Sequence, residues 1–308
     1  MKTGIALLVA LMVSLAQAAP PDVVHAAGTQ SRPAPAALLR AKYASLTDAL
    51  KSNPYNRPLH VESMEQESSL KGDVFAVVPY PFAAVASALT EAAPWCDILI
   101  LPVTTKGCRA ASRAGAGATL SLRIGLKYEQ SADDAFPLEF AYRVTANSPQ
   151  YFSVQLEADT GPLGTRDYRV LVEAVPVEAG KTFLHLRYAY AYGTAGRLAM
   201  QAYLATLGAG KVGFTLSNGK LTGGMRGVIE RNAMRFHLAI DAHLAAASAP
   251  AVEQVDRRLK TWFDSTEQYA RQLHEMSRDE YVAMKRREVQ RQRAPQDIVR
   301  ALPTSERF

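Results

Sequence analysis

Residues 152–192 have the sequence FSVQLEADTGPLGTRDYRVLVEAVPVEAGKTFLHLRYAYAY, in which apolar and polar side chains alternate. The alternation occupies three runs, 152–158, 168–176 and 182–192, and the turn residues Gly161–Gly164 separate the first two. A period of two indicates a strand with one dry face and one wet face. Three successive runs of this kind predict three strands of one antiparallel sheet.

The same alternation continues towards the N-terminus through 120–128 and 138–144, so the predicted sheet spans residues 119–192. In every run the even-numbered positions carry apolar side chains, among them Leu122, Phe140 and Leu186. We therefore expect the even-numbered face to point towards the core and the odd-numbered face towards water.

Helical patterns follow the sheet. Residues 195–207 fit one helix, and 228–247 fit a longer one that ends before Ser248-Ala249-Pro250. Between them, Asn218-Gly219 is typical of a tight hairpin turn. The chain thus changes from period two to helical spacing at about residue 193.

The part that precedes the sheet mixes both patterns. Residues 59–78 predict one long strand or two bent pieces, and the alanine-rich segment 82–93 predicts a helix. The apolar run Ile98–Pro102 predicts another extended segment. Apolar residues at helical spacing, with prolines after them, predict an N-terminal helical segment within 36–58.

The order of these elements resembles the helix-grip fold of the START and Bet v 1-like superfamily. GDVFAVVPYPFAAVASALTEAAPWCDIL (72–99) is similar to its first strand and helix, and FSVQLEADTGPLGTRDYRVLVEAVPV (152–177) to its middle hairpin. GVIERNAMRFHLAIDAHLAA (227–246) is similar to its long helix. The resemblance covers residues 59–247. It implies an α+β protein in which a curved antiparallel sheet wraps around a long C-terminal helix, here with extra flanking helices.

That fold implies a cavity between the sheet and helix 228–247, and a hydrophobic ligand, with a lipid as the expected class. Such a site is mostly apolar with a few polar groups. The residues that we expect to line it are Phe140, Tyr142, Phe152, Leu156, Tyr168, Tyr188, Tyr190, Met234 and Leu238. The alternative is a structural or interaction module in which these side chains fill a core.

Four further residues are candidate polar groups of the cavity. His185 and Arg187 alternate in the last run, and His237 and Asp241 are four apart on the long helix, so each pair shares a face. A second alternative is therefore an enzyme of the cyclase or hydratase type, with His185 or His237 as the proton carrier. A solvated or structural role is the commoner one for such pairs. No catalytic, metal-binding or phosphate-binding motif is present, so we predict no cofactor and no metal.

The N-terminus predicts export. Lys2 precedes an uncharged apolar run, and Ala16-Gln17-Ala18 has the small-x-small pattern of a signal peptidase site. We expect a signal peptide at 1–18 that is cleaved after Ala18, a flexible lead-in at 19–35, and a periplasmic or secreted protein. Cys96 and Cys108 are the only cysteines, and in an oxidising compartment we expect them to form a structural disulfide, worth about 3 kcal/mol.

Residues 251–308 predict a C-terminal helical extension. One helix is expected at 252–276, and the spacing of Ser277 and Glu280 fits the capping box of a further helix. The basic run KRREVQRQR (285–293) is either the solvated face of a docked helix, which we favour, or a surface that contacts an anionic membrane. The net charge of +6 is too modest to predict a nucleic-acid partner for an exported protein.

Overall fold

A computed structural model describes residues 34–113, 117–178, 180–206 and 208–293. The predicted signal peptide (1–18), nearly all of the lead-in (19–35) and the last residues of the extension (294–308) lie outside the described residues. Their predicted roles therefore stay predictions.

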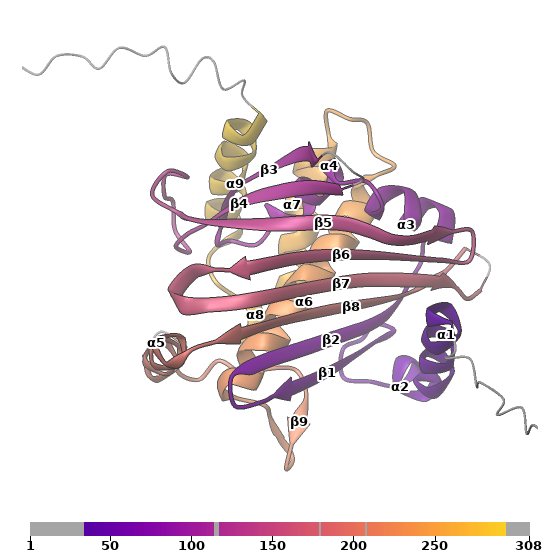
Figure 1. Ribbon diagram of the computed structural model, residues 1–308, viewed down its shortest axis with the longest axis horizontal. Coiled ribbons are helices and arrows are strands. Elements are labelled where there is room, and N and C mark those ends of the chain that lie inside the picture. Colours follow the sequence, from indigo (N-terminus) through magenta and orange to yellow (C-terminus); the bar gives the residue numbers. More distant parts are fainter. Residues whose placement is uncertain (1–33, 114–116, 179, 207, 294–308) are drawn as a thin grey trace, which may run out of the picture. The chain divides into compact units, whose positions relative to one another are not determined.

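One eight-stranded antiparallel sheet forms the centre of the described chain, with the order β1-β2-β8-β7-β6-β5-β4-β3 (Figure 1). The five strands predicted between 119 and 192 are all present. The strands are β1 (Leu59–Glu65), β2 (Ser69–Val78), β3 (Thr105–Arg113), β4 (Gly117–Ile124), β5 (Phe136–Ser148), β6 (Tyr151–Thr160), β7 (Thr165–Pro176) and β8 (Thr182–Tyr192).

The long helix α6 (Gly224–Ala246) crosses one face of this sheet, which we call the inner face (Figure 1). The even-numbered residues of β4–β8 lie on the inner face and join the main core, as the alternation predicts. The predicted α+β class and helix-grip arrangement are confirmed. Helix α6 packs mainly against β1, β2 and β8. Its position leaves the inner face of β4 and β5 to be covered by other segments.

Two short helices, α3 (Phe82–Leu89) and α4 (Ala93–Leu99), connect β2 to β3. The predicted extended segment at 98–102 is wrong, because Ile98 and Leu99 belong to α4. Both are fully buried, and a short apolar run has the same pattern in a buried helix as in a buried strand. The predicted disulfide is confirmed: Cys96 of α4 is bonded to Cys108 of β3.

Residues 59–78 form two strands rather than one, joined as a hairpin in which Val61 pairs with Val74. Strand β1 therefore adds an eighth, edge strand to the sheet. The outer face beside it is covered by α1 (Pro35–Ser45) and α2 (Thr47–Lys51), which replace the single predicted helix. Leu39, Leu46 and Leu50 of these helices pack on Phe75 and Phe183 of the sheet.

The segment between β8 and α6 contains α5 (Thr194–Ala205) and a small hairpin, β9 (Leu216–Ser217) with β10 (Lys220–Leu221). Helix α5 contacts β8 and the short 3-10 turn η1 (Pro162–Gly164) and is otherwise largely exposed. The predicted tight turn is present, with Asn218 and Gly219 both at positive φ.

The C-terminal extension consists of α7 (Gln254–Glu267), α8 (Ala270–Leu273) and α9 (Arg278–Arg293), so the predicted helix 252–276 is interrupted. The predicted capping box is confirmed, since the Ser277 amide donates to Glu280 Oε2 (3.0 Å) and the Glu280 amide donates to Ser277 Oγ (3.4 Å). Helix α7 packs on α6, and α9 packs on α7 and β3. Among the described residues no helix has the length and apolarity that a membrane crossing requires.

Candidate functional site

A cavity of about 380 Å³, which we call the sheet–helix cavity, lies between the inner face and α6. Strands β4, β5, β7 and β8 form its wall, α6 forms its floor, and α5 with the 3-10 turn η1 lies at its edge. The volume falls near the lower end of the range for small-molecule sites, roughly 300–1,000 Å³. The alternative of a completely filled core is therefore wrong.

Aromatic side chains form the apolar wall of this cavity. Phe140, Tyr168, Tyr188 and Tyr190, four of the predicted residues, line it. The rings of Tyr168 and Tyr190 are stacked with centroids 5.3 Å apart, and Phe236 of α6 packs on Tyr188 at 5.1 Å. Burial raises the pKa of each of these tyrosines, so their hydroxyls stay protonated at neutral pH and can donate or accept a hydrogen bond.

The other predicted apolar residues are fully buried in the core but do not line the cavity: Tyr142, Phe152, Leu156, Met234 and Leu238. Helices α3 and α4 fill that end of the inner face. Tyr142 donates to the Leu89 carbonyl (3.1 Å), and Phe152 packs on Phe82 with ring centroids 5.8 Å apart. Only a void of about 10 Å³ remains beside Leu156.

A buried cation lies at the floor of the sheet–helix cavity. Arg231 is only 2% exposed and lines the cavity from α6. Its Nη1 donates to the Val212 carbonyl at 3.2 Å, and among the described residues it forms no ion pair with a carboxylate. Burial and the neighbouring Arg235 lower the pKa of the Arg231 guanidinium. The guanidinium nevertheless stays charged, as arginine side chains in proteins do.

Further cations surround a single carboxylate next to Arg231. Glu275 lies 2.6 Å from both Lys127 Nζ and Arg235 Nη2, and 3.1 Å from Lys211 Nζ. Burial alone would raise the pKa of Glu275, but Arg235 and the two lysines outweigh it and hold that pKa below its ordinary value. Three cations therefore share one carboxylate, and Arg231 adds a fourth positive charge beside them, so this end of the cavity has a surplus of positive charge.

Arg231 and Arg235 are cavity-lining residues that the sequence analysis missed. They are four apart on α6, a spacing that places two cations on one helix face. That signal was present, but two arginines on an amphipathic helix normally indicate its solvated side. Here α6 is enclosed between the sheet and α7, so even its polar positions are buried.

His185 and Arg187 do not reach the cavity, because odd-numbered residues of β8 lie on the outer face. His185 is held between Asp73 (Nε2 to Oδ1, 2.7 Å) and Glu173 (Nδ1 to Oε1, 2.8 Å). Arg187 Nε donates to the same Asp73 oxygen (2.7 Å). Burial alone would lower the pKa of His185, but the two carboxylates outweigh it and raise that pKa. The group is an ion cluster on the outer face of the sheet, in which His185 and Asp73 are buried and Arg187 is partly exposed.

His237 and Asp241 also lie outside the sheet–helix cavity. Both line a second cavity of about 640 Å³ beside the ends of β1 and β2, which we call the edge cavity. The two residue pairs of α6, Arg231 with Arg235 and His237 with Asp241, lie about 120° apart around the helix. The structure thus places neither His185 nor His237 as a proton carrier in the sheet–helix cavity.

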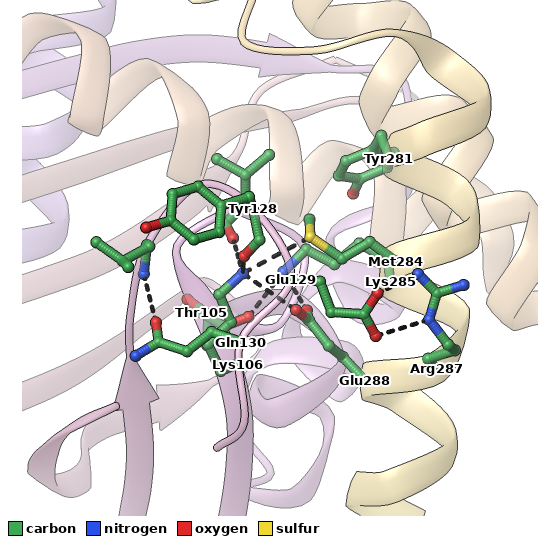
Figure 2. Close-up of polar contacts among 12 residues, drawn as sticks. Thr105, Lys106, Tyr128, Glu129, Gln130, Tyr281, Met284, Lys285, Arg287 and Glu288 are labelled. Carbon is green, nitrogen blue, oxygen red and sulfur yellow. Dashed lines mark hydrogen bonds and ion pairs between the residues drawn. The ribbon is translucent and has the colours of Figure 1, made fainter. Parts of the chain in front are cut away.

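Figure 2 shows a third cluster, between β3 and α9, in which Lys106 and Lys285 share Glu288. All three side chains have no exposed surface, and the ion pairs measure 3.2 Å and 2.7 Å. Lys106 Nζ also donates to the carbonyls of Val103 and Tyr128, and Lys285 Nζ to that of Thr105. The cluster lines neither cavity, and it attaches α9 to the sheet. Lys285, in the basic run, is therefore buried, as the favoured docked-helix prediction requires.

The order of elements decides the fold. After the added strand β1, the chain runs from one strand through two short helices and six antiparallel strands to α5, a small hairpin and the long helix that crosses their inner face. The chain has a helix-grip fold. Segments α1, α2, β1 and α7–α9 are additions to it.

The solved structures to which the chain is similar are distant from it in sequence. Norcoclaurine synthase from Thalictrum flavum is 12% identical over 49% of this chain and 82% of its own, with a TM-score of 0.31. The Zhui aromatase/cyclase from Streptomyces sp. R1128 is 14% identical over 69% and 96%, with a TM-score of 0.31. Ara h 8.0201 is 9% identical over 61% and 99%, with a TM-score of 0.34. No protein-family model and no curated protein matches the chain.

Proposed function

We propose that this protein is an exported binding or carrier protein for a small amphipathic anion, such as a single-chain fatty acid, held in the sheet–helix cavity. The observation that carries the proposal is Arg231, a buried guanidinium that faces an aromatic cavity and has no carboxylate partner among the described residues. An unpaired buried charge costs free energy, and a ligand carboxylate would supply the missing counter-charge with a bidentate hydrogen bond.

The rest of the cavity suits the apolar part of such a ligand. The rings of Phe140, Tyr168, Tyr188 and Tyr190 offer apolar surface within reach of the cationic end. At about 380 Å³ the cavity suits a ligand of one short chain rather than a two-chain lipid. The Cys96–Cys108 disulfide supports export, because disulfides persist in oxidising compartments.

The proposal is tested by displacement of 8-anilinonaphthalene-1-sulfonate, a fluorescent amphipathic anion, by decanoate and by decanol. These two competitors differ only in the head group. We expect decanoate to displace the probe at least tenfold more effectively than decanol. Arg231→Met should remove most of this preference, because a hydrogen bond to a charged group contributes about 1.5–3 kcal/mol. Equal displacement by the acid and the alcohol in the wild-type protein would contradict the proposal.

Arg226→Met is the matched control. Arg226 is one turn earlier on the same helix, donates to Ser63 Oγ (3.0 Å), and does not line the sheet–helix cavity. This variant removes one positive charge of the same kind, so it should retain the preference for decanoate. If Arg226→Met lost as much affinity as Arg231→Met, the effect would be a general one of net charge, and the assignment of Arg231 as the anion-binding residue would fail.

A further inference from the structure

The edge cavity is separate from the sheet–helix cavity and shares no lining residue with it. Its walls come from the ends of β1 and β2, from α1 and α2, from the β7–β8 turn and from α6. Apolar side chains dominate the part beside the sheet, where Leu50, Leu59 and Val78 lie with Pro58 and Pro79. The cavity therefore has the apolar body of a small-molecule site.

One buried polar group in this wall has no partner. His237 is 3% exposed, and among the described residues nothing forms a hydrogen bond with its Nδ1. Burial lowers the pKa of His237 to about 4, although Asp241 opposes the shift, so the imidazole is neutral at pH 7. This nitrogen has almost no accessible surface, so the imidazole borders the cavity through its other ring atoms.

The charges near His237 are already balanced. Arg57 Nη1 lies 2.9 Å from Asp241 Oδ2, and Arg57 Nη2 donates to Ser265 Oγ at 3.2 Å. At the outer rim Lys181 is paired with Glu178 (2.9 Å), and the exposed Lys51 also lines the cavity. In contrast to the sheet–helix cavity, the inner end of the edge cavity has no surplus charge for an ionised ligand to neutralise, so an uncharged ligand fits it better.

We propose that the edge cavity is a second small-molecule site, which takes an uncharged ligand with an apolar body and a hydroxyl group that bonds to His237. A hydroxyl both donates and accepts, so it can bond to the imidazole in either of its neutral tautomers. The ring of Tyr80 and the two prolines give flat apolar walls next to His237. A phenol has both a flat apolar ring to pack on these walls and a hydroxyl to bond to His237.

The test uses p-cresol and toluene, which differ by one hydroxyl. The imidazole resonances of the ¹³C-histidine-labelled protein are followed by NMR during both titrations, and the His237 signal is assigned by its loss in His237→Phe. We expect a saturable shift of the His237 signal with p-cresol, at a dissociation constant about tenfold lower than for toluene. A shift that does not saturate, or equal affinities for the two compounds, would overturn the proposal.

Two variants locate the effect. Thr47→Trp places a large side chain in the edge cavity without altering His237, and it should abolish the p-cresol shift. Arg231→Met, in the other cavity, should leave p-cresol binding unchanged. Decanoate affinity shows that Thr47→Trp is folded, and it tests the sheet–helix cavity independently. Persistence of the p-cresol shift in Thr47→Trp, or its loss in Arg231→Met, would place the phenol elsewhere and reject the second site.

Discussion

Arg231 and Glu288 are both enclosed charges, but their surroundings differ. Glu288 lies between two buried lysines, each within 3.2 Å, so its charge is compensated inside the protein. Arg231 donates a hydrogen bond to a backbone carbonyl and opens onto a cavity. The pairing of Glu288 shows that this fold can place an opposite charge beside a buried one. We therefore attribute the missing counter-charge of Arg231 to a ligand.

The Lys106–Glu288–Lys285 cluster has two ammonium groups and one carboxylate. One positive charge is therefore not neutralised, and this predicts a pH dependence of stability. Burial lowers the pKa of Lys285 to about 8 from 10.5, although Glu288 opposes the shift. Between these pH values the unfolded chain keeps a proton that the folded chain has released. The contribution of Lys285 to the free energy of unfolding therefore rises with pH in this window, by at most about 1.4 kcal/mol per pH unit.

Urea denaturation of the wild-type protein and Lys285→Met from pH 7.5 to 9.5 measures this contribution. The free energy of unfolding of the wild type, minus that of Lys285→Met, should increase from pH 7.5 to 9.5. Lys220→Met, which alters an exposed lysine of β10, should show a difference that is constant with pH. If the difference in free energy of unfolding between the wild type and Lys285→Met stayed constant or shrank as the pH rises, burial would not be lowering the pKa of Lys285.

At the scale of elements, the contact between β2 and α6 sets how closely the helix approaches the sheet. Gly72 faces α6, and a Cβ atom built there would lie 3.1 Å from the Ile229 carbonyl oxygen and 3.2 Å from Ala233 Cβ. The absence of a side chain at this position lets α6 lie directly on the edge of the sheet. The floor of the sheet–helix cavity depends on this approach, because Arg231 follows Ile229 by two residues.

Gly72→Val should force α6 away from β2 and lower the free energy of unfolding by about 1–3 kcal/mol, as overpacked cores do. Ser69→Val is the control, since it adds a valine to the same strand on the outer face, and it should change that free energy by about 0.5 kcal/mol or less. Urea denaturation measures both. Equal effects of the two substitutions would contradict the close approach at Gly72.

Strands in which apolar and polar residues alternate regularly could be predicted from the sequence. Strands that bury polar residues with partners elsewhere in the chain could not. Strands β4–β8 follow from period two, which survives because one face of each strand is packed on the core. Strand β3 (TKGCRAASR) lacks that pattern, because its inner positions include Lys106 and Cys108. Glu288 compensates Lys106 from a distant segment, and no local sequence pattern records such a partner.

At the scale of the whole molecule, the additions to the helix-grip fold determine which cavities exist. Helices α1 and α2 and strand β1 enclose the edge cavity. The segment around Glu275, between α8 and α9, supplies the carboxylate at the cationic end of the sheet–helix cavity. The resemblance predicted a cavity with a tyrosine wall, but it could not predict the residues at its polar end, since these come from α6 faces and flanking segments that only the tertiary packing defines.

The most direct test of the anion site is a crystal structure of the protein in complex with decanoate. We predict that the carboxylate lies within hydrogen-bond distance, about 2.7–3.2 Å, of the Arg231 guanidinium. The chain should lie against Tyr168, Tyr188 and Tyr190. A decanoate whose carboxylate points to solvent, or that occupies the edge cavity instead, would contradict the account.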